Sequence, residues 1–240
     1  MKEKKSELIG EKLIKELEKK KNFFQAQTTA SFFKTQKGAY GFGDIFWGVT
    51  TPQSEAIVKK FWQVISLAET EKLLDHPVHE VRSTALRVLV KKYQKGNAIE
   101  KKEVVKSYQR KIGRINNWDL VDLSAPKILG DYFFSRDKKF LYQLAKSKNL
   151  WRRRIAIVST LEFIRRKNFT DTLRLAELLL SDPADLVNKA VGWMLREVGK
   201  CNKEILQNFL KKNKEKMVRI TWRYATEKFS SKEKKALEQR

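Results

Sequence analysis

The chain has 240 residues and carries 52 Lys and Arg against 28 Asp and Glu, a formal net charge of +24 at pH 7. Hydrophobic residues make up 41% of the sequence, so the charge excess does not indicate global disorder. An excess of this size predicts attraction to polyanions. Nucleic acid is the leading candidate, and an acidic membrane surface is the second.

The cysteine content and the distribution of apolar residues predict the compartment. The single cysteine, Cys201, excludes an internal disulfide and fits a reducing environment. The N-terminal segment has no uninterrupted apolar core, which argues against a secretory signal. No stretch approaches the roughly 20 apolar residues that a membrane span requires. We therefore expect a cytoplasmic protein without a membrane segment, and nothing in the sequence demands more than a monomer.

Helical periodicity dominates the sequence, which has only 4 Pro and 10 Gly. Residues 35–53 are the exception, because four glycines and Pro52 indicate a long loop there. No Gly/Ser-rich linker divides the rest, so we predict one all-α domain over residues 1–240. The predicted helices are 5–22, 24–34, 53–67, 79–95, 99–113, 118–130, 136–146, 150–166, 171–181, 184–199, 203–212, 216–228 and 231–238.

Several helices resemble one another in sequence. LLDHPVHEVRSTALRVL at 73–89 matches LLSDPADLVNKAVGWML at 179–195, and the segments at 119–125, 152–158 and 217–225 fit the same register. A repeat of 31 to 40 residues is typical of stacked antiparallel helix pairs of the HEAT or armadillo kind. The alternative is coincidence among helices rich in Leu, Ala and Val. The equivalent positions in five successive units are Arg82, Asp122, Arg154, Asn188 and Arg219.

The helix predicted to begin near Trp118 places an acid on an apolar face. Trp118, Asp122, Ala125 and Leu129 follow the spacing of one helical face, so Asp122 is flanked by apolar neighbours. Asp119 lies in the first turn of the helix, where a negative charge interacts favourably with the helix dipole, so a structural role is enough to explain its presence. Asp122 has no such reason and is a candidate functional residue.

Pro126 predicts a change in the same helix. A proline inside a helix removes the backbone hydrogen bond to the carbonyl four residues earlier, which here belongs to Asp122. We therefore expect the helix to kink or end at Pro126.

Two further helices carry candidate residues. Arg154 interrupts an apolar stripe in 150–164, and Trp193 shares a non-core face with Lys189 and Arg196. An aromatic ring beside two cations suggests a surface that faces a ligand. The structural alternative is that Trp193 packs against neighbouring helices and that Asp122 and Arg154 form an internal ion pair.

Several segments together resemble the signature segments of the DNA alkylation repair glycosylases of the AlkD type. They are NNWDLVD at 116–122, LWRRRIAI at 150–157 and KAVGWMLREVGK at 189–200, in the same order and spacing as in that family. The segment at 32–52 also resembles the N-terminal loop of these enzymes, and the whole resemblance extends over residues 30–229.

The resemblance implies a C-shaped superhelix of HEAT-like repeats whose concave basic groove holds duplex DNA. It also implies hydrolysis of the N-glycosidic bond of N3- and N7-alkylated purines. Asp122 corresponds to the active-site aspartate, Trp118 and Trp193 to the tryptophans that cradle the damaged nucleotide, and Arg154 to a DNA-contacting arginine. Family members in which these positions are changed lack activity, whereas all four residues are present here.

Hydrolysis of an alkylated purine nucleotide would explain why a basic protein places a carboxylate at its site. An alkylated purine is already cationic and leaves without a general acid, while the sugar becomes oxocarbenium-like and is stabilised by a nearby anion. Other cations would neutralise phosphates of the partner, duplex DNA with alkylated purines. The candidates for phosphate contacts are Arg82, Arg152, Arg153, Lys189, Arg196, Arg219 and Arg223.

Other chemistries find little support. Two histidines and one cysteine give no metal-ligand spacing, so we expect no metal and no small-molecule cofactor. GAYGFG lacks the Lys-Ser/Thr of a phosphate-binding loop. Two alternatives to a glycosylase stay open: a catalytically inactive protein that binds distorted DNA or structured RNA, and a helical-repeat scaffold for an acidic protein.

Overall fold

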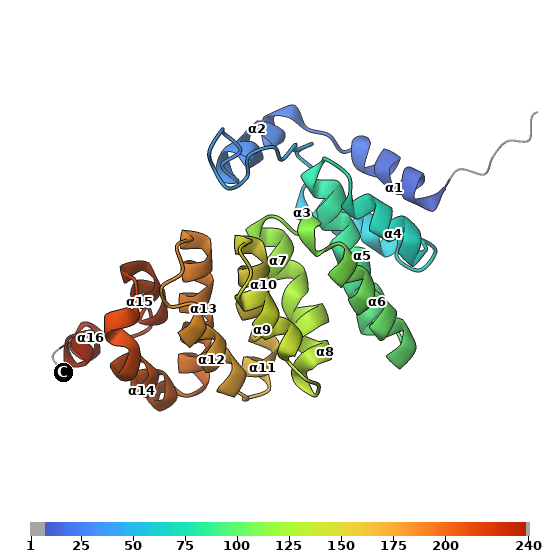
Figure 1. Ribbon diagram of the computed structural model, residues 1–240. Coiled ribbons are helices and arrows are strands. Elements are labelled where there is room, and N and C mark those ends of the chain that lie inside the picture. The colour runs from blue at the N-terminus through green and yellow to red at the C-terminus, as the bar shows by residue number, and fades with distance from the viewer. Residues whose placement is uncertain (1–7, 239–240) are drawn as a thin grey trace, which may run out of the picture. The chain divides into compact units, whose positions relative to one another are not determined.

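The computed structural model describes residues 8–238 and divides the chain into two compact units, Met1–Ser124 and Ala125–Arg240 (Figure 1). Each unit is described by itself. The prediction of a single domain stays a prediction, and the start of the predicted helix at 5–22 lies outside the described residues. The described part is all-α, which confirms the predicted fold class; its one β-type pairing is an isolated bridge between Ile45 and Val78.

The helices of the first unit are α1 (Ile9–Glu18), α2 (Phe23–Phe32), α3 (Thr51–Phe61), α4 (Leu67–Leu74), α5 (His79–Lys95), α6 (Ala98–Arg110), the 3₁₀ turn η1 (Ile112–Arg114) and α7 (Trp118–Ala125). The second unit contains η2 (Pro126–Gly130), α8 (Asp131–Phe134), α9 (Lys139–Ala145), α10 (Leu150–Ser159), α11 (Leu161–Arg165), α12 (Thr170–Leu178), α13 (Asp185–Cys201), α14 (Lys203–Asn213), η3 (Lys214–Lys216), α15 (Arg219–Ala225) and α16 (Ser231–Glu238). No helix among the described residues is long and apolar enough to cross a membrane.

Helix α5 is the centre of the first unit and packs against α3, α4 and α6. Its side chains Ala85, Leu86 and Leu89 are fully buried. From Ala85 onward the buried side chains of α5 are apolar or aromatic, whereas its first turn buries the charged and polar residues His79, Glu80 and Arg82. In Figure 1, α4, α5 and α6 lie side by side.

Helix α13 has the same role in the second unit, where it packs against α10, α14 and most extensively α15. Gly192 allows the close approach to α15, because a Cβ atom at this position would lie 2.5 Å from the Cβ atom of Tyr224 and 2.7 Å from the carbonyl oxygen of Thr221. A larger residue at position 192 would force the two helices apart.

The sequence interpretation missed α4. It extended the preceding helix to residue 67, whereas α3 ends at Phe61 and a second helix begins after Ser66. The hydroxyl of Ser66 accepts a hydrogen bond from the backbone N–H of Glu69 at 3.1 Å, and the Glu69 carboxylate accepts one from the backbone N–H of Ser66 at 3.1 Å. This reciprocal capping box is a sequence signal for a helix start that the periodicity analysis overlooked.

The helix predicted at 118–130 divides at its proline. The α-helical segment ends at Ala125, and the chain continues through a π-helical turn from Pro126 to Gly130 before α8 begins. The expected change at Pro126 is therefore confirmed, and its cause is the missing backbone donor of proline.

In three helices, a side chain in the first turn donates a hydrogen bond to a backbone carbonyl oxygen that lies six residues earlier in the chain, just before the helix. Arg82 makes it to His76 at 3.1 Å, and Asn188 makes it to Asp182 at 2.9 Å. In α10 the corresponding bond comes from Arg153, also at 2.9 Å, and not from Arg154. This shared contact makes Arg153 of α10, in place of Arg154, the structural counterpart of Arg82 and Asn188.

The predicted loop at 35–53 is irregular, and its second half is fixed to the start of α5. The carboxylate of Glu80 accepts hydrogen bonds from the backbone N–H groups of Trp47, Gly48 and Val49, at 2.7 to 3.2 Å. Gly48 has a φ of +77°, and a Cβ atom there would lie 2.2 Å from the carbonyl oxygen of Asn22. The turn therefore requires glycine.

Candidate functional site

Trp118 and Asp122 lie one turn apart on α7, and both are half-buried. Ala125 continues the same face and is fully buried, as the spacing predicted. Burial, with a further contribution from the negative charge of Asp122, raises the pKa of Tyr108, whose hydroxyl lies 3.0 Å from the hydroxyl of Ser124. Asp122 therefore sits at the border between the core of the first unit and its surface.

Asn117 holds the start of α7. Its side-chain oxygen accepts a hydrogen bond from the backbone N–H of Trp118 at 2.8 Å, and its side-chain nitrogen donates to Asp44 at 2.8 Å. Asn117 is fully buried, so these bonds satisfy both ends of an amide that burial would otherwise leave unpaired. The contact connects the loop that carries Asp44 with the residue that begins the candidate site.

His79 lies between two carboxylates next to Asn117. Its Nε2 atom is 2.8 Å from Asp119, and its Nδ1 atom is 3.3 Å from Asp44. The His79 side chain is only 3% exposed. Burial alone would lower the pKa of His79, but the charges and hydrogen bonds of the two carboxylates, Asp119 first, outweigh burial and raise the pKa to about 9. His79 is therefore a buried imidazolium at neutral pH.

Arg82 completes this buried polar cluster, which consists of Asp44, His79, Arg82, Asn117 and Asp119. Its guanidinium lies 2.5 Å from Asp44 and is 2% exposed. Burial tends to raise the pKa of Asp44, but hydrogen bonding to His79 and the charge of Arg82 outweigh it and lower the pKa. Two cations thus share two carboxylates, and this balance of charge lets the cluster stay buried.

A stack of aromatic rings covers the cluster. The Phe33 ring is nearly parallel to the Trp118 indole, with centroids 5.2 Å apart and an interplanar angle of 14°. Phe33 also stacks on the ring of Phe46, with centroids 5.1 Å apart. Phe46 in turn stacks on the imidazole of His79, with centroids 4.7 Å apart. Phe32 meets Trp118 edge-on at 5.8 Å. The orientation of Trp118 is therefore fixed by Phe32, the last residue of α2, and by Phe33, which follows it.

The sequence interpretation did not assign this cluster. It explained Asp119 by the helix dipole alone and considered the two histidines as possible metal ligands. The available signal was the presence of His79 and Asp44 among apolar and aromatic neighbours, because a charged group in such a setting needs a partner. The partner could not be named because His79 is 35 residues from Asp44 and 40 from Asp119 in sequence.

The second unit holds the other two residues predicted for catalysis. Arg154 in α10 is buried and donates a hydrogen bond to the carbonyl oxygen of Leu186 at 2.5 Å. Trp193 in α13 is half-buried, and its indole N–H donates to the Glu197 carboxylate at 3.1 Å. The structure therefore brings Trp118 and Asp122 together on α7 of the first unit. Arg154 and Trp193 lie on two different helices of the second unit, α10 and α13.

The residues predicted to contact phosphates differ in how far their charge is already paired. Arg82 pairs with Asp44, Arg153 with Asp182, and Arg196 with Glu227. Lys189 is half-buried. The three exposed members of the set are Arg152, Arg219 and Arg223.

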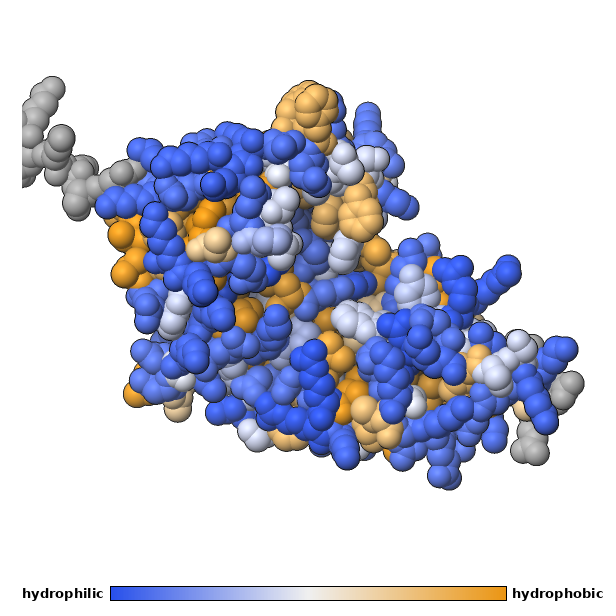
Figure 2. Space-filling model, turned by 180° about the vertical axis from the view of Figure 1, so that it is seen from behind, coloured by the Kyte–Doolittle hydropathy of each residue, from blue (hydrophilic) through white to orange (hydrophobic). Residues whose placement is uncertain are grey.

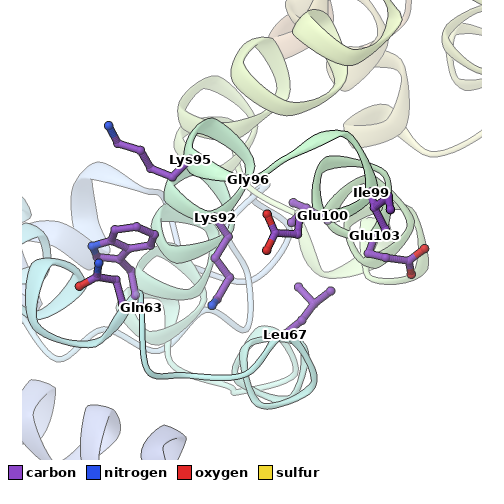
Figure 3. Close-up of a pocket in the computed structure, with 10 residues that line it drawn as sticks. Gln63, Leu67, Lys92, Lys95, Gly96, Ile99, Glu100 and Glu103 are labelled. Carbon is purple, nitrogen blue, oxygen red and sulfur yellow. The ribbon is translucent and has the colours of Figure 1, made fainter.

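Two cavities in the first unit are relevant to ligand binding. One, of about 280 Å³, is lined in part by Phe33, Phe46, His79 and Asp119, and so borders the polar cluster. The other, of about 400 Å³, lies among α5, α6 and the segment that leads from α3 to the first residue of α4, and Lys92 and Glu100 point into it (Figure 3). None of the predicted site residues lines the second cavity. Within residues 8–238, no group of three or more His, Cys, Asp or Glu side chains is arranged to hold a metal ion.

Comparison with known proteins identifies the family. The family model described as DNA alkylation repair enzyme matches residues 13–229 of this chain. The chain belongs to this family. A search of curated proteins gives no match.

Among solved structures, this chain is similar to a chain titled predicted DNA alkylation repair enzyme, from Enterococcus faecalis. The TM-score is 0.68 at 17% sequence identity, over 88% of this chain and 98% of the other. At that identity the likeness shows the fold. The family membership indicates an enzyme with a role in the repair of alkylated DNA.

Proposed function

We propose that this protein is a DNA glycosylase that hydrolyses the N-glycosidic bond of cationic N3- or N7-alkylated purines in duplex DNA. The observation that carries the proposal is the pair Trp118 and Asp122, which lie one turn apart on α7 and are both partly open to solvent. Family membership and the net charge of +24 support DNA as the substrate.

In this mechanism Asp122 acts on the deoxyribose. The alkylated base carries a positive charge and leaves as a neutral purine, so the barrier lies in the electron-poor sugar that remains. The Asp122 carboxylate stabilises the oxocarbenium-like sugar electrostatically and orients or deprotonates the water that attacks it. Water supplies the hydroxyl that replaces the base, and the DNA strand stays intact.

The tryptophans and arginines have separate roles in the proposal. The indole ring of Trp118 attracts the cationic base through a cation–π interaction worth roughly 0.5–2 kcal/mol, and Trp193 is a second aromatic candidate for this role. Arg154 is buried and donates to the carbonyl oxygen of Leu186, so the proposal gives it the role of positioning α10 against α13 and not that of a direct phosphate contact. The exposed Arg152, Arg219 and Arg223 hold the DNA backbone, which gives affinity that falls as salt rises.

The decisive experiment measures released bases. Purified protein is incubated with methylated duplex DNA, and 7-methylguanine and 3-methyladenine are quantified by chromatography. We expect wild-type protein to release them and Asp122→Asn to lose about 100-fold or more of the rate, the order seen when one preorganised electrostatic group is removed. DNA affinity should persist in this variant.

The matched control is Glu204→Gln, which makes the same change from carboxylate to amide at an exposed position in α14. We expect this variant to release bases at the wild-type rate. Equal turnover in Asp122→Asn and wild type would show the mechanism to be wrong. Tight DNA binding by wild type without any base release would instead favour an inactive protein that recognises distorted DNA.

A further inference from the structure

Helix α2 exposes an unusual surface for a helix of a folded unit. None of its ten residues is buried. Phe23, Phe24 and Phe32 on this helix, and Phe42 in the following loop, have between 64% and 79% of their surface exposed. Isolated exposed apolar residues are ordinary, but four phenylalanines gathered on one short segment indicate a binding surface.

The exposed face of α2 has a regular composition. Phe24, Thr28 and Phe32 follow the i, i+4, i+8 spacing of one face, so a hydroxyl lies between two aromatic rings. Asn22 caps the helix by accepting a hydrogen bond from the backbone N–H of Gln25 at 2.9 Å, so the face is held in place by its own helix start. Figure 2 shows apolar side chains projecting from a mostly hydrophilic surface at the top of the view, where α2 lies.

The charge around α2 identifies the kind of partner. Residues 19–43 contain five lysines and no Asp or Glu. Lys20, Lys34 and Lys37 in this segment are exposed. Aromatic rings interleaved with cations and free of acids are the combination that binds single-stranded nucleic acid, because rings stack on bases while the amines meet phosphates.

The surface is also continuous with the candidate site. Phe32, the last residue of α2, meets the Trp118 indole edge-on with centroids 5.8 Å apart. A nucleic acid strand bound along α2 would therefore lead to Trp118 within the same unit. This contact favours DNA over a membrane or a protein partner.

We propose that the exposed face of α2, formed by Phe24, Thr28 and Phe32, binds unpaired or unstacked DNA bases next to the repaired position. This inference deepens the proposed function, since it names the DNA feature that the first unit recognises. Phe24 stacks on a base, and the lysines of 19–37 neutralise the adjoining phosphates.

The test separates base stacking from phosphate attraction. Affinity is measured by fluorescence anisotropy for a DNA duplex with a two-base unpaired bulge and for the same duplex fully paired, neither containing an alkylated base. Wild type should prefer the bulged duplex, because only that duplex offers free base faces. Phe24→Ala should reduce this preference roughly five- to hundredfold, the effect of removing one stacking ring.

Matched variants separate the contribution that the aromatic ring of Phe24 makes to the preference for bulged DNA from the contributions of apolar surface and of positive charge. Phe24→Trp should keep the preference, and Phe24→Leu should lose it, since leucine is apolar but cannot stack. Lys37→Gln should weaken binding to both duplexes equally. Ile99→Ala, which truncates an apolar side chain that is 75% exposed on α6, should change neither affinity.

Several outcomes would overturn the inference. They are equal wild-type affinity for the two duplexes, an unchanged preference in Phe24→Ala, or retention of the preference by Phe24→Leu. Binding to phosphatidylserine vesicles that Phe24→Leu retains and Phe24→Ala loses would identify a membrane surface. Concentration-dependent self-association that Phe24→Ala abolishes would identify a second copy. Base release from methylated DNA is scored separately, so loss of this inference leaves the glycosylase proposal testable.

Discussion

The charge of His79 depends on two carboxylates that come from different segments of the first unit, Asp44 from the loop and Asp119 from α7. Arg82 binds the other oxygen of Asp44, and Asn117 connects that carboxylate to the first residue of α7. The other His of the unit, His76, has its pKa lowered, by burial first and by the charge of Arg82. The two histidines therefore give opposite contributions to the dependence of stability on pH.

We predict that part of the free energy of unfolding is lost between about pH 6.5 and pH 9. The pKa of His79 is raised from 6.5 to about 9 in the folded protein, so the folded state binds the proton more tightly than the unfolded chain. The stabilisation is fully present below pH 6.5 and disappears as pH rises through about 9. Urea unfolding at intervals across this range measures it, and His79→Gln should lack this part of the pH dependence.

His76→Gln is the matched control. Because the folded pKa of His76 lies below 6.5, His76 is neutral in both folded and unfolded protein over most of this window. Its replacement should leave the slope of stability against pH unchanged between pH 6.5 and 9. A His79→Gln variant that keeps the wild-type slope would show that the imidazolium is not held by the two carboxylates.

The sequence predicted local relations among residues and missed distant ones. The shared face of Trp118 and Asp122 follows from helical spacing alone, and the position of the break follows from Pro126. The pairing of Arg82 with Asp44 could not be predicted, since 38 residues separate them and either charge could equally have met solvent or DNA. Long-range pairing depends on packing, which residue spacing does not encode.

At the scale of elements, α13 and α15 pack closely because Gly192 has no side chain. We predict that Gly192→Ala lowers the free energy of unfolding by about 1–3 kcal/mol, since the added Cβ atom would overlap backbone and Cβ atoms of α15. Chemical denaturation measures this difference. A change below about 0.5 kcal/mol would mean that the two helices adjust freely.

Gly113→Ala provides the comparison within the same chain. A Cβ atom added at Gly113 would meet no heavy atom within 4 Å, and its φ lies outside the left-handed region. We expect a change within about 0.5 kcal/mol for this variant. The contrast isolates the packing between α13 and α15 from any general effect of replacing glycine.

Element boundaries were predicted where the sequence carries a distinct signal. The long helices α5 and α13 were predicted to within about two residues, because many periodic apolar positions define them. The short helix α4 was missed, since eight residues give little periodicity and its capping box lies directly after an apolar run. The tertiary contacts with α5 and α6, which stabilise α4, cannot be inferred from its own sequence.

At the scale of the whole molecule, the net charge of +24 should make DNA binding strongly dependent on salt. Each cation that neutralises one phosphate of duplex DNA contributes about 0.9 to the slope of log affinity against log salt concentration. We predict that Arg223→Gln, at an exposed position of α15, reduces the magnitude of this slope by about 0.9. Titrations of a DNA duplex at four salt concentrations give the slope.

Arg136→Gln serves as the control, since it removes the same charge from an exposed arginine outside the predicted DNA-binding set. We expect its slope to match wild type. Equal reductions in both variants would indicate that only the total charge matters and that Arg223 makes no particular phosphate contact.

The fold class and the family were accessible from the sequence because both depend on features spread over the whole chain: periodicity, repeated segments and several motifs in order. The substrate, the bond hydrolysed and the residues of the site remain proposals. They depend on where individual side chains meet a ligand, and a pattern of residue types constrains this only loosely.

The attachment of the loop to Glu80 has a consequence for how the protein can change. The Glu80 carboxylate holds the segment 47–49 through hydrogen bonds from main-chain amides alone. These hydrogen bonds do not involve the side chains of the segment. Gly48 is required by the turn and Val49 is buried, so Trp47, which is half-buried, is the position of this segment where a substitution can alter the chemistry that the loop presents while its path stays the same. The loop is thus a place where related enzymes can acquire new preferences without rebuilding the helices beneath it.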